Sequence, residues 1–271
     1  EELLIAAGAL LVLWRGMRNG NDSFARGNLL EAAILLYMGV GLLLMVLNRP
    51  FPAVALAGYR AQVQYMVWFF LILRLLEDRK DAATLYGVFA AVVFFLSLHG
   101  IYQYAVGVEI PASWVSQTEA GVRTRVFSIT GSPNIFGSLI VMAAPMLAAL
   151  MYYCKTAKWK IASLLAVGAA CLCILFTFSR GAWVGLIVAV VLFALYVDKR
   201  LLLLMTGAMA GILAAVPSIT ARLTYLFTTD YAEASAIGGR ALRWQVGHDL
   251  LMENSPWLGF GLGRFGGAVA M

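Results

Sequence analysis

Long apolar runs dominate the chain, and short polar connectors separate them. The runs lie at residues 3–14, 29–47, 61–76, 82–105, 135–153, 161–178, 181–197 and 201–216. A helix that crosses the hydrocarbon layer needs roughly 20 apolar residues. The alternation of apolar and polar positions that barrel strands require is absent. The pattern therefore predicts an all-α integral membrane protein with about eight transmembrane helices, the first of them partial.

The composition excludes an ordinary soluble domain. Hydrophobic residues make up 62% of the 271 residues and charged residues only 13%, which leaves too little polar surface for a soluble protein of this length. The cysteines, Cys154, Cys171 and Cys173, lie in or beside apolar runs without the spacing of a metal site. We therefore expect buried apolar thiols, no disulfide, no metal and no other cofactor.

The chain divides into a hydrophobic part and a more polar tail. Residues 1–216 contain all the long apolar runs and are predicted to form the transmembrane bundle. Residues 217–271 are predicted to form an outer-face loop that carries an amphipathic helix. Because the chain starts beside a short apolar run and stops in the middle of the tail, we expect a fragment in which this loop is truncated.

The distribution of positive charge predicts which loops face the cytoplasm. Eleven of the twenty Lys and Arg residues lie in the connectors at 15–28, 74–81, 154–160 and 198–200. The other nine, all arginines, lie in the longer alternate segments at 48–60, 106–134, 178–180 and 217–271. Loops rich in Lys and Arg face the cytoplasm. The net charge of +6 therefore reflects membrane topology rather than nucleic-acid binding, and the second group of loops faces outward.

An arginine-containing segment precedes the apolar run at 135–153. It extends from Arg123 through Arg125 to Asn134 and ends in G-S-P-N. A glycine turn followed by polar residues and a proline is typical of a helix start, so we predict that a helix begins at 132–134. The N-terminus of such a helix suits an anion. The simpler alternative is that these residues only cap the helix.

A single arginine, Arg180, lies between two apolar runs with almost no loop around it, in the sequence F-S-R-G-A-W. A charge at this depth in a membrane is costly, so it is a candidate functional residue. The alternative is a structural arginine whose charged end reaches the membrane surface and anchors the helix beside Trp183.

The tail contains a third group of candidate residues. In a helix over 240–252, Arg240, Trp244 and His248 lie on one face and Arg243 flanks them. The G-F-G-L-G sequence that follows is not a dinucleotide fingerprint, because it follows no strand. The alternative is an interfacial amphipathic helix whose arginines only face solvent.

Several arginines at one membrane surface, with few acids beside them, suit a lipid diphosphate. Its charge lies at the depth of the interface, and hydrogen bonds from arginine to such a group contribute roughly 1.5–3 kcal/mol each. Cations beside a phosphate leaving group also stabilise the charge that develops as its bond breaks.

At these residues the chain resembles the O-antigen ligase/polymerase superfamily of membrane glycosyltransferases. The resemblance covers about residues 123–271 and is carried by R-V-F-S-I-T-G-S-P-N-I-F-G, F-S-R-G-A-W-V-G, and R-x-x-x-W followed by S-P-W-L-G-F-G-L-G. It implies a GT-C-like helical bundle in the bacterial inner membrane, with the active face outward and short helices in the outer loop.

The resemblance also implies an activity. Members move a glycan from an undecaprenyl-diphosphate carrier to an acceptor hydroxyl of a lipid or polysaccharide, without metal, in cell-surface polysaccharide biosynthesis. By the match, Arg180 and Arg240 are catalytic and hold the diphosphate. Arg125 and Arg243 assist them in binding substrate, and we add Arg123, Asn134 and Trp244 as candidate binding residues.

The histidines depart from the family pattern. The family's catalytic histidine lies beyond the G-F-G-L-G segment, where this chain has stopped. His248 lies before that segment and stays only a candidate acid or base. His99 lies in an apolar run before Gly100, and we expect it to be a packed histidine.

Two other functions remain open. A small-anion transporter, of the bicarbonate kind, would carry ionisable groups at the middle of the membrane and broken helices in paired positions. Here the charges gather at helix ends, Pro145 is the only proline well inside a run, and Glu31 is the nearest intramembrane acid. This pattern favours the enzyme. A non-catalytic scaffold is the third possibility.

Overall fold

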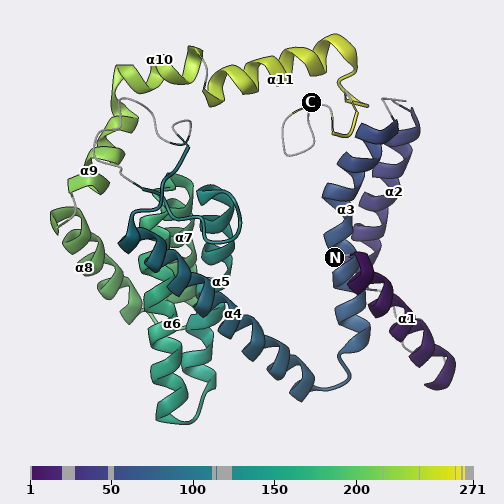
Figure 1. Ribbon diagram of the computed structural model, residues 1–271, viewed down its shortest axis with the longest axis horizontal. Helices are drawn as coiled ribbons and strands as arrows, with labels where there is room; N and C mark the ends of the chain where they lie inside the picture. The colour runs from purple at the N-terminus through teal and green to yellow at the C-terminus, as the bar shows by residue number, and fades with distance from the viewer. Residues whose placement is uncertain are drawn as a thin grey trace. The chain divides into compact units, whose positions relative to one another are not determined.

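The computed structural model describes residues 2–19, 28–47, 52–111, 114, 124–215, 217–237, 239–259, 261–263 and 265. Helices account for the regular structure of these residues, and they contain no strand. The helices are α1 (Glu2–Asn19), α2 (Leu29–Leu47), α3 (Pro52–Leu75), α4 (Arg79–Val106), α5 (Pro133–Tyr153), α6 (Ala157–Phe176), α7 (Arg180–Tyr196), α8 (Arg200–Ala215), α9 (Pro217–Thr224), the 3-10 turn η3 (Tyr225–Phe227), α10 (Thr229–Ile237) and α11 (Arg240–Asn254) (Figure 1). The predicted all-α class is confirmed.

Each predicted apolar run falls on one of the helices α1 to α8. The predicted helix start at 132–134 is confirmed by α5, which begins at Pro133. The largest difference is in α3, which begins at Pro52 rather than near 61. Arg60, Gln62 and Gln64 interrupt the apolar run, but these straight-chain polar residues are good helix formers, so they do not end the helix.

Four of the described helices are long and apolar enough to cross a membrane: α2, α4, α5 and α6. The apolar helix α7 is shorter, at 17 residues. The chain is therefore a multi-pass membrane protein. The count of eight spans and the outward direction of the tail stay predictions, as does the predicted division at residue 216.

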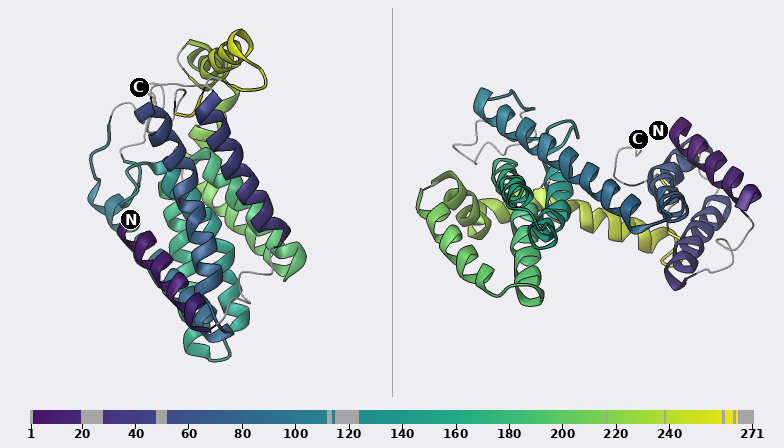
Figure 2. Two further views of the ribbon diagram at one scale, coloured as in Figure 1. Left: turned by 90° about the vertical axis from the view of Figure 1, so that its right-hand side faces the viewer. Right: turned by 90° about the horizontal axis from the view of Figure 1, so that it is seen from below.

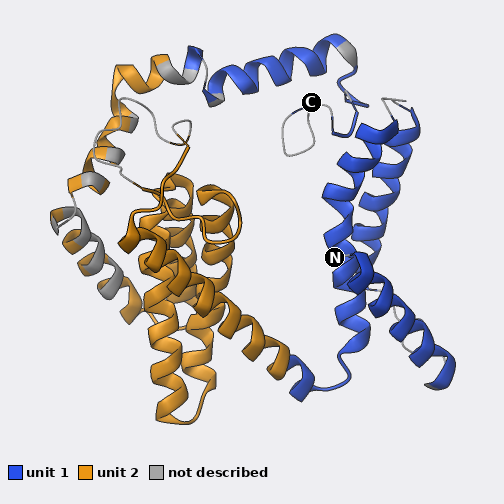
Figure 3. Ribbon diagram, in the orientation of Figure 1, with its two compact units in different colours: residues 1–82, 234–271 blue, residues 83–233 orange. Residues whose placement is uncertain are grey.

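The chain forms two compact units (Figure 3). We call residues 83–233 the central unit, and residues 1–82 with 234–271 the flanking unit. Nearly all of α4 and all of α5 to α9 belong to the central unit, whereas α1 to α3 and α11 belong to the flanking unit.

The core of the central unit lies where α5 packs against α6 and α7, and these three helices run side by side (Figures 1 and 2). Phe136, Ile140 and Ile174 are fully buried there. Small residues allow close approach: a Cβ atom on Gly137 would lie 2.7 Å from the Cβ of Ala182. This tight contact brings the N-terminal ends of α5 and α7 together, as is usual where membrane helices pack through small residues.

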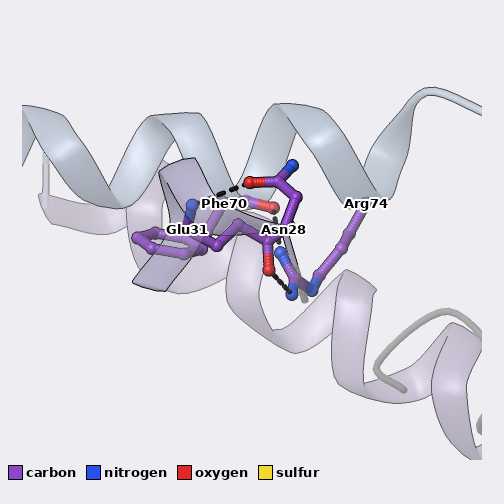
Figure 4. Close-up of polar contacts among 4 residues, drawn as sticks. All are labelled: Asn28, Glu31, Phe70 and Arg74. Atoms are coloured by element: carbon purple, nitrogen blue, oxygen red, sulfur yellow. Dashed lines mark hydrogen bonds and ion pairs between the residues drawn. The ribbon is translucent and has the colours of Figure 1, made fainter. Parts of the chain in front are cut away.

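In the flanking unit, α1 and α2 pack against α3, and a buried ion pair joins α2 to α3 (Figure 4). Arg74 Nη2 lies 3.3 Å from Glu31 Oε2, and their side chains are only 16% and 8% exposed. The Glu31 amide donates to Asn28 Oδ1 at 2.8 Å, and Arg74 also donates to the Phe70 carbonyl. The acid that the transporter alternative depended on is therefore neutralised by a partner in the same unit.

Candidate functional site

Arg180 is the first residue of α7 and is half-buried in the central unit. Its Cζ lies 5.1 Å from the ring centroid of Tyr231 and 6.0 Å from that of Tyr225. Both rings come from the segment that follows α8. The guanidinium nitrogen Nη1 is buried. Arg180 is therefore not a freely moving surface cation, because aromatic faces hold its charged end.

The turn before Arg180 is tightly built. Phe178 adopts a left-handed conformation, with φ of 49°, and it is buried together with Thr177 and Ser179. Thr177 Oγ1 donates to the Ile174 carbonyl at 2.7 Å and accepts from the Ser179 amide at 3.1 Å. These bonds connect the end of α6 directly to the start of α7, so they fix where Arg180 leaves the backbone.

The alternative of an anchoring Arg180 placed Trp183 beside it at the helix end. It is only 6% exposed, belongs to the hydrophobic core cluster, and donates from Nε1 to the Ile174 carbonyl at 3.1 Å. An anchoring tryptophan would lie at the membrane surface. Trp183 instead secures α7 against the end of α6.

Arg125 is buried, with 6% of its surface exposed. Its Nε donates to the Thr177 carbonyl at 2.9 Å, and Nη1 donates to the Trp114 carbonyl at 2.6 Å. Nη2 lies 3.3 Å from Asn134 Oδ1 and 3.5 Å from the Phe178 carbonyl. The carbonyls of Thr177 and Phe178 lie at the C-terminal end of α6, where the helix dipole favours a cation. Arg125 thus fastens the turn before Arg180 to the start of α5.

Gln103 of α4 holds the rest of this segment. Its Oε1 accepts from the amides of Phe127 and Ser128 at 3.1 and 2.8 Å, and its Nε2 donates to the Ser128 carbonyl at 3.2 Å. Ser128 has a φ of 48°, which is costly for a residue with a side chain. The buried Gln103 amide supports that conformation through three hydrogen bonds.

His99 lies at the same end of α4. Its Nδ1 is 3.0 Å from Ser128 Oγ, and its ring is stacked near Tyr102, with centroids 6.4 Å apart. His99 is nevertheless exposed, so the expectation of a packed histidine is not met.

Asn134 is the second residue of α5, is exposed, and receives the bond from Arg125. Ser132, the residue before the helix, makes no side-chain capping bond. The predicted helix start is therefore correct, but the side-chain cap that was the simpler explanation of this motif is not made by Ser132.

The predicted helix over 240–252 is confirmed by α11. Arg243 and Trp244 are exposed, Trp244 by 76%. His248 is exposed too, and its Nδ1 lies 3.4 Å from Asp249 Oδ1. Arg123 and the side chain of Arg240 lie outside the described residues. The structure thus brings Arg125, Asn134 and the turn before Arg180 together in the central unit. Arg243, Trp244 and His248 of α11 belong to the flanking unit.

The glycine-rich segment after α11 docks on α3. A Cβ atom on Gly58 would lie 2.5 Å from the Gly263 nitrogen, and a Cβ atom on Gly263, whose φ is 75°, would lie 2.6 Å from the Val54 carbonyl oxygen. The Phe265 ring covers Gly247 of α11 in the same way. These glycines serve close backbone packing rather than binding of a dinucleotide.

Three residues near the site were missed by sequence reasoning: Gln103, Tyr225 and Tyr231. Gln103 is a polar residue inside the long apolar run of α4, and this position is a signal that could have identified it as a candidate. The two tyrosines lie six residues apart in the tail, and no spacing rule connects them to Arg180.

Residues 165–270 match the family model described as O-antigen ligase. In this segment the chain is similar to that family. The match confirms the resemblance to the O-antigen ligase/polymerase superfamily. No curated protein and no solved structure matches the chain.

The matched segment includes Arg180, both tyrosines and α11, whereas Arg125 and Asn134 precede it. The family supports a glycan-transfer role in polysaccharide biosynthesis, with lipid-linked glycan and polysaccharide substrates. It gives no support to the alternative of an anion transporter.

Proposed function

We propose that this protein transfers a glycan from an undecaprenyl-diphosphate carrier to an acceptor hydroxyl at the outer face of the inner membrane. The observation that carries the proposal is Arg180: it lies inside the family-matched segment, at the start of a membrane helix, with its guanidinium held by aromatic rings. A fixed guanidinium presents donors in a planar fork that matches phosphate oxygens.

The proposed reaction is a direct displacement with inversion at the sugar carbon. The acceptor oxygen attacks the anomeric carbon, and the bond from that carbon to the diphosphate oxygen breaks. The electron pair leaves with the lipid diphosphate, and the acceptor proton passes to a base. Arg180 and Arg240 would bind the diphosphate and stabilise the negative charge that develops on it, so arginines rather than a metal supply the positive charge.

The remaining candidates take different roles in this proposal. Arg125 supports the site from behind, because its guanidinium nitrogens donate to the carbonyls of Thr177 and Trp114 and to Asn134. Arg243 and Trp244 are exposed on α11 and suit contacts to the glycan or the diphosphate. Arg123 is a further binding candidate. His248 is a candidate to accept the acceptor's proton, with Asp249 beside its Nδ1.

The test follows release of lipid diphosphate from an undecaprenyl-diphosphate-linked oligosaccharide by the purified protein in lipid nanodiscs, with a chelator present and several acceptors offered. Arg180→Ala and Arg240→Ala are compared with Arg79→Ala. All three arginines are the first residue of a helix, but Arg79 lies in a connector predicted to face the cytoplasm.

We expect release that survives the chelator, falls by roughly 100-fold to 1,000-fold in Arg180→Ala and in Arg240→Ala, and is unchanged in Arg79→Ala. A folded wild-type protein that neither binds the carrier nor releases lipid diphosphate with any acceptor would overturn the proposal.

A further inference from the structure

The two tyrosines beside Arg180 form a built arrangement rather than a chance contact. Their rings meet edge to face, with centroids 5.6 Å apart and planes at 76°. Tyr231 is the nearer ring to the Arg180 guanidinium, at 5.1 Å, while Tyr225 lies at 6.0 Å, the usual limit for a cation–π contact. Tyr225 therefore contacts Arg180 weakly and supports Tyr231 from the side.

Thr228, which lies between the two tyrosines in the sequence, connects their backbones by hydrogen bonds. Thr228 Oγ1 donates to the Tyr225 carbonyl at 2.8 Å and accepts from the Tyr231 amide at 3.3 Å. The second bond is that of a helix N-cap, because α10 begins at Thr229. The turn from η3 into α10 thus holds both rings toward Arg180 by local hydrogen bonds.

An aromatic ring beside a guanidinium attracts its positive charge and so restrains where the guanidinium lies. Stacking on an aromatic ring also removes rotamer freedom from a long side chain before the ligand arrives. Without the ring, the entropy lost in ordering the side chain would weaken binding of the ligand. An arginine fixed in this way binds phosphate more tightly than the same arginine on a mobile stem.

We propose that Tyr231, braced by Tyr225, is a positioning residue that holds the Arg180 guanidinium ready for the diphosphate of the lipid carrier. The proposal rests on the proposed function of Arg180. It gives the segment from η3 to α10 a role in donor binding, through an arginine on a different helix. A direct stacking of the tyrosines on a sugar ring is the rival explanation, and the experiment separates the two.

The experiment is a double-mutant cycle on Tyr231 and Arg180, in protein held in lipid nanodiscs. Tyr231→Leu removes the aromatic face, and Tyr231→Phe is the matched control that keeps the face without the hydroxyl. Both are made alone and with Arg180→Ala. Binding of undecaprenyl diphosphate without any sugar is titrated, and KM and kcat for the glycan-bearing carrier are measured separately.

We expect Tyr231→Leu to weaken binding of the sugar-free lipid by roughly three- to tenfold, in line with a partly exposed cation–π contact. The same factor should appear in KM. Tyr231→Phe should remain within about twofold of wild type. In the Arg180→Ala background, Tyr231→Leu should have no further effect, since the contact it removes is already gone.

Two outcomes overturn the proposal. An equal loss from Tyr231→Leu with and without Arg180, seen only with the glycan-bearing carrier, shows that the ring binds sugar. Equal damage from Tyr231→Phe and Tyr231→Leu shows that the hydroxyl, rather than the aromatic face, matters.

A thermal unfolding cycle on the wild type, Tyr231→Leu, Arg180→Ala and their double variant separates failure of this inference from failure of the proposed function. Coupling between Tyr231 and Arg180 in unfolding, without any binding of lipid diphosphate to the wild type, means that the stacking exists but serves no diphosphate site. Absence of coupling in unfolding and in binding means that the stacking itself is wrong.

Discussion

The arginines of the two units differ in how deeply their side chains are buried. In the central unit, Arg125 is buried and bound to backbone carbonyls, and Arg180 is half-buried against tyrosine rings. In the flanking unit, Arg243 projects from the exposed surface of α11. Sequence motifs mark all three alike, but burial separates them into an arginine that builds the site, one that is held within it, and one that faces outward. Changes at Arg125 and Arg243 test this separation, and a change at Gly58 tests the packing within the flanking unit.

The largest effect is expected from Arg125→Ala. It leaves the carbonyls of Thr177 and Phe178 without their charged donor in a buried region, which should lower the free energy of unfolding by about 1–3 kcal/mol for each carbonyl. Thermal and denaturant unfolding in a mild detergent would measure the loss. Arg125→Lys should recover little of it, since an ammonium group cannot reach the same spread of acceptors.

The opposite result for Arg125 is informative. A stable Arg125→Ala protein whose affinity for the lipid carrier alone is reduced would make Arg125 a substrate ligand, and the distinction between the two central arginines would fail.

A middle-sized effect is expected from Gly58→Ala. The added methyl group meets the backbone of Gly263, so the glycine-rich segment must move away from α3, at a cost of about 1–3 kcal/mol. Hydrogen exchange of residues 255–265 should rise. Gly39→Ala in α2 is the matched control, because a Cβ atom there meets nothing within 4 Å. Unchanged exchange in Gly58→Ala would contradict the docking.

The smallest effect on stability is expected from Arg243→Ala. An exposed side chain should change the free energy of unfolding by no more than about 0.5 kcal/mol. Donor KM should nevertheless rise by roughly threefold to tenfold, and the rise should shrink at high salt, where exposed charges are screened. A loss of stability comparable to that of Arg125→Ala would erase the contrast between the units.

The helices were predictable from the sequence because apolar runs of membrane length permit little else. The sequence could also single out Arg180, since a charge between two apolar runs needs an explanation, but its role in catalysis stays a prediction. The contacts of Arg125 were not predictable, because its partners are mostly main-chain carbonyls. Every residue has such a carbonyl, so the sequence does not mark which ones accept its hydrogen bonds. Tyr231 was hidden for a related reason: its relation to Arg180 depends on how the turn at Thr228 folds, not on spacing.

The bond from Arg125 to the Thr177 carbonyl spans 52 residues of sequence. A ribosome adds residues at about 5–20 per second, so roughly 3–10 s separate the synthesis of the arginine from that of its acceptor. During that interval the newly made Arg125 must remain hydrated at the membrane surface or be shielded by the insertion machinery. Synthesis order thus leaves the Nε donor of Arg125 without its native acceptor until the end of α6 has been made.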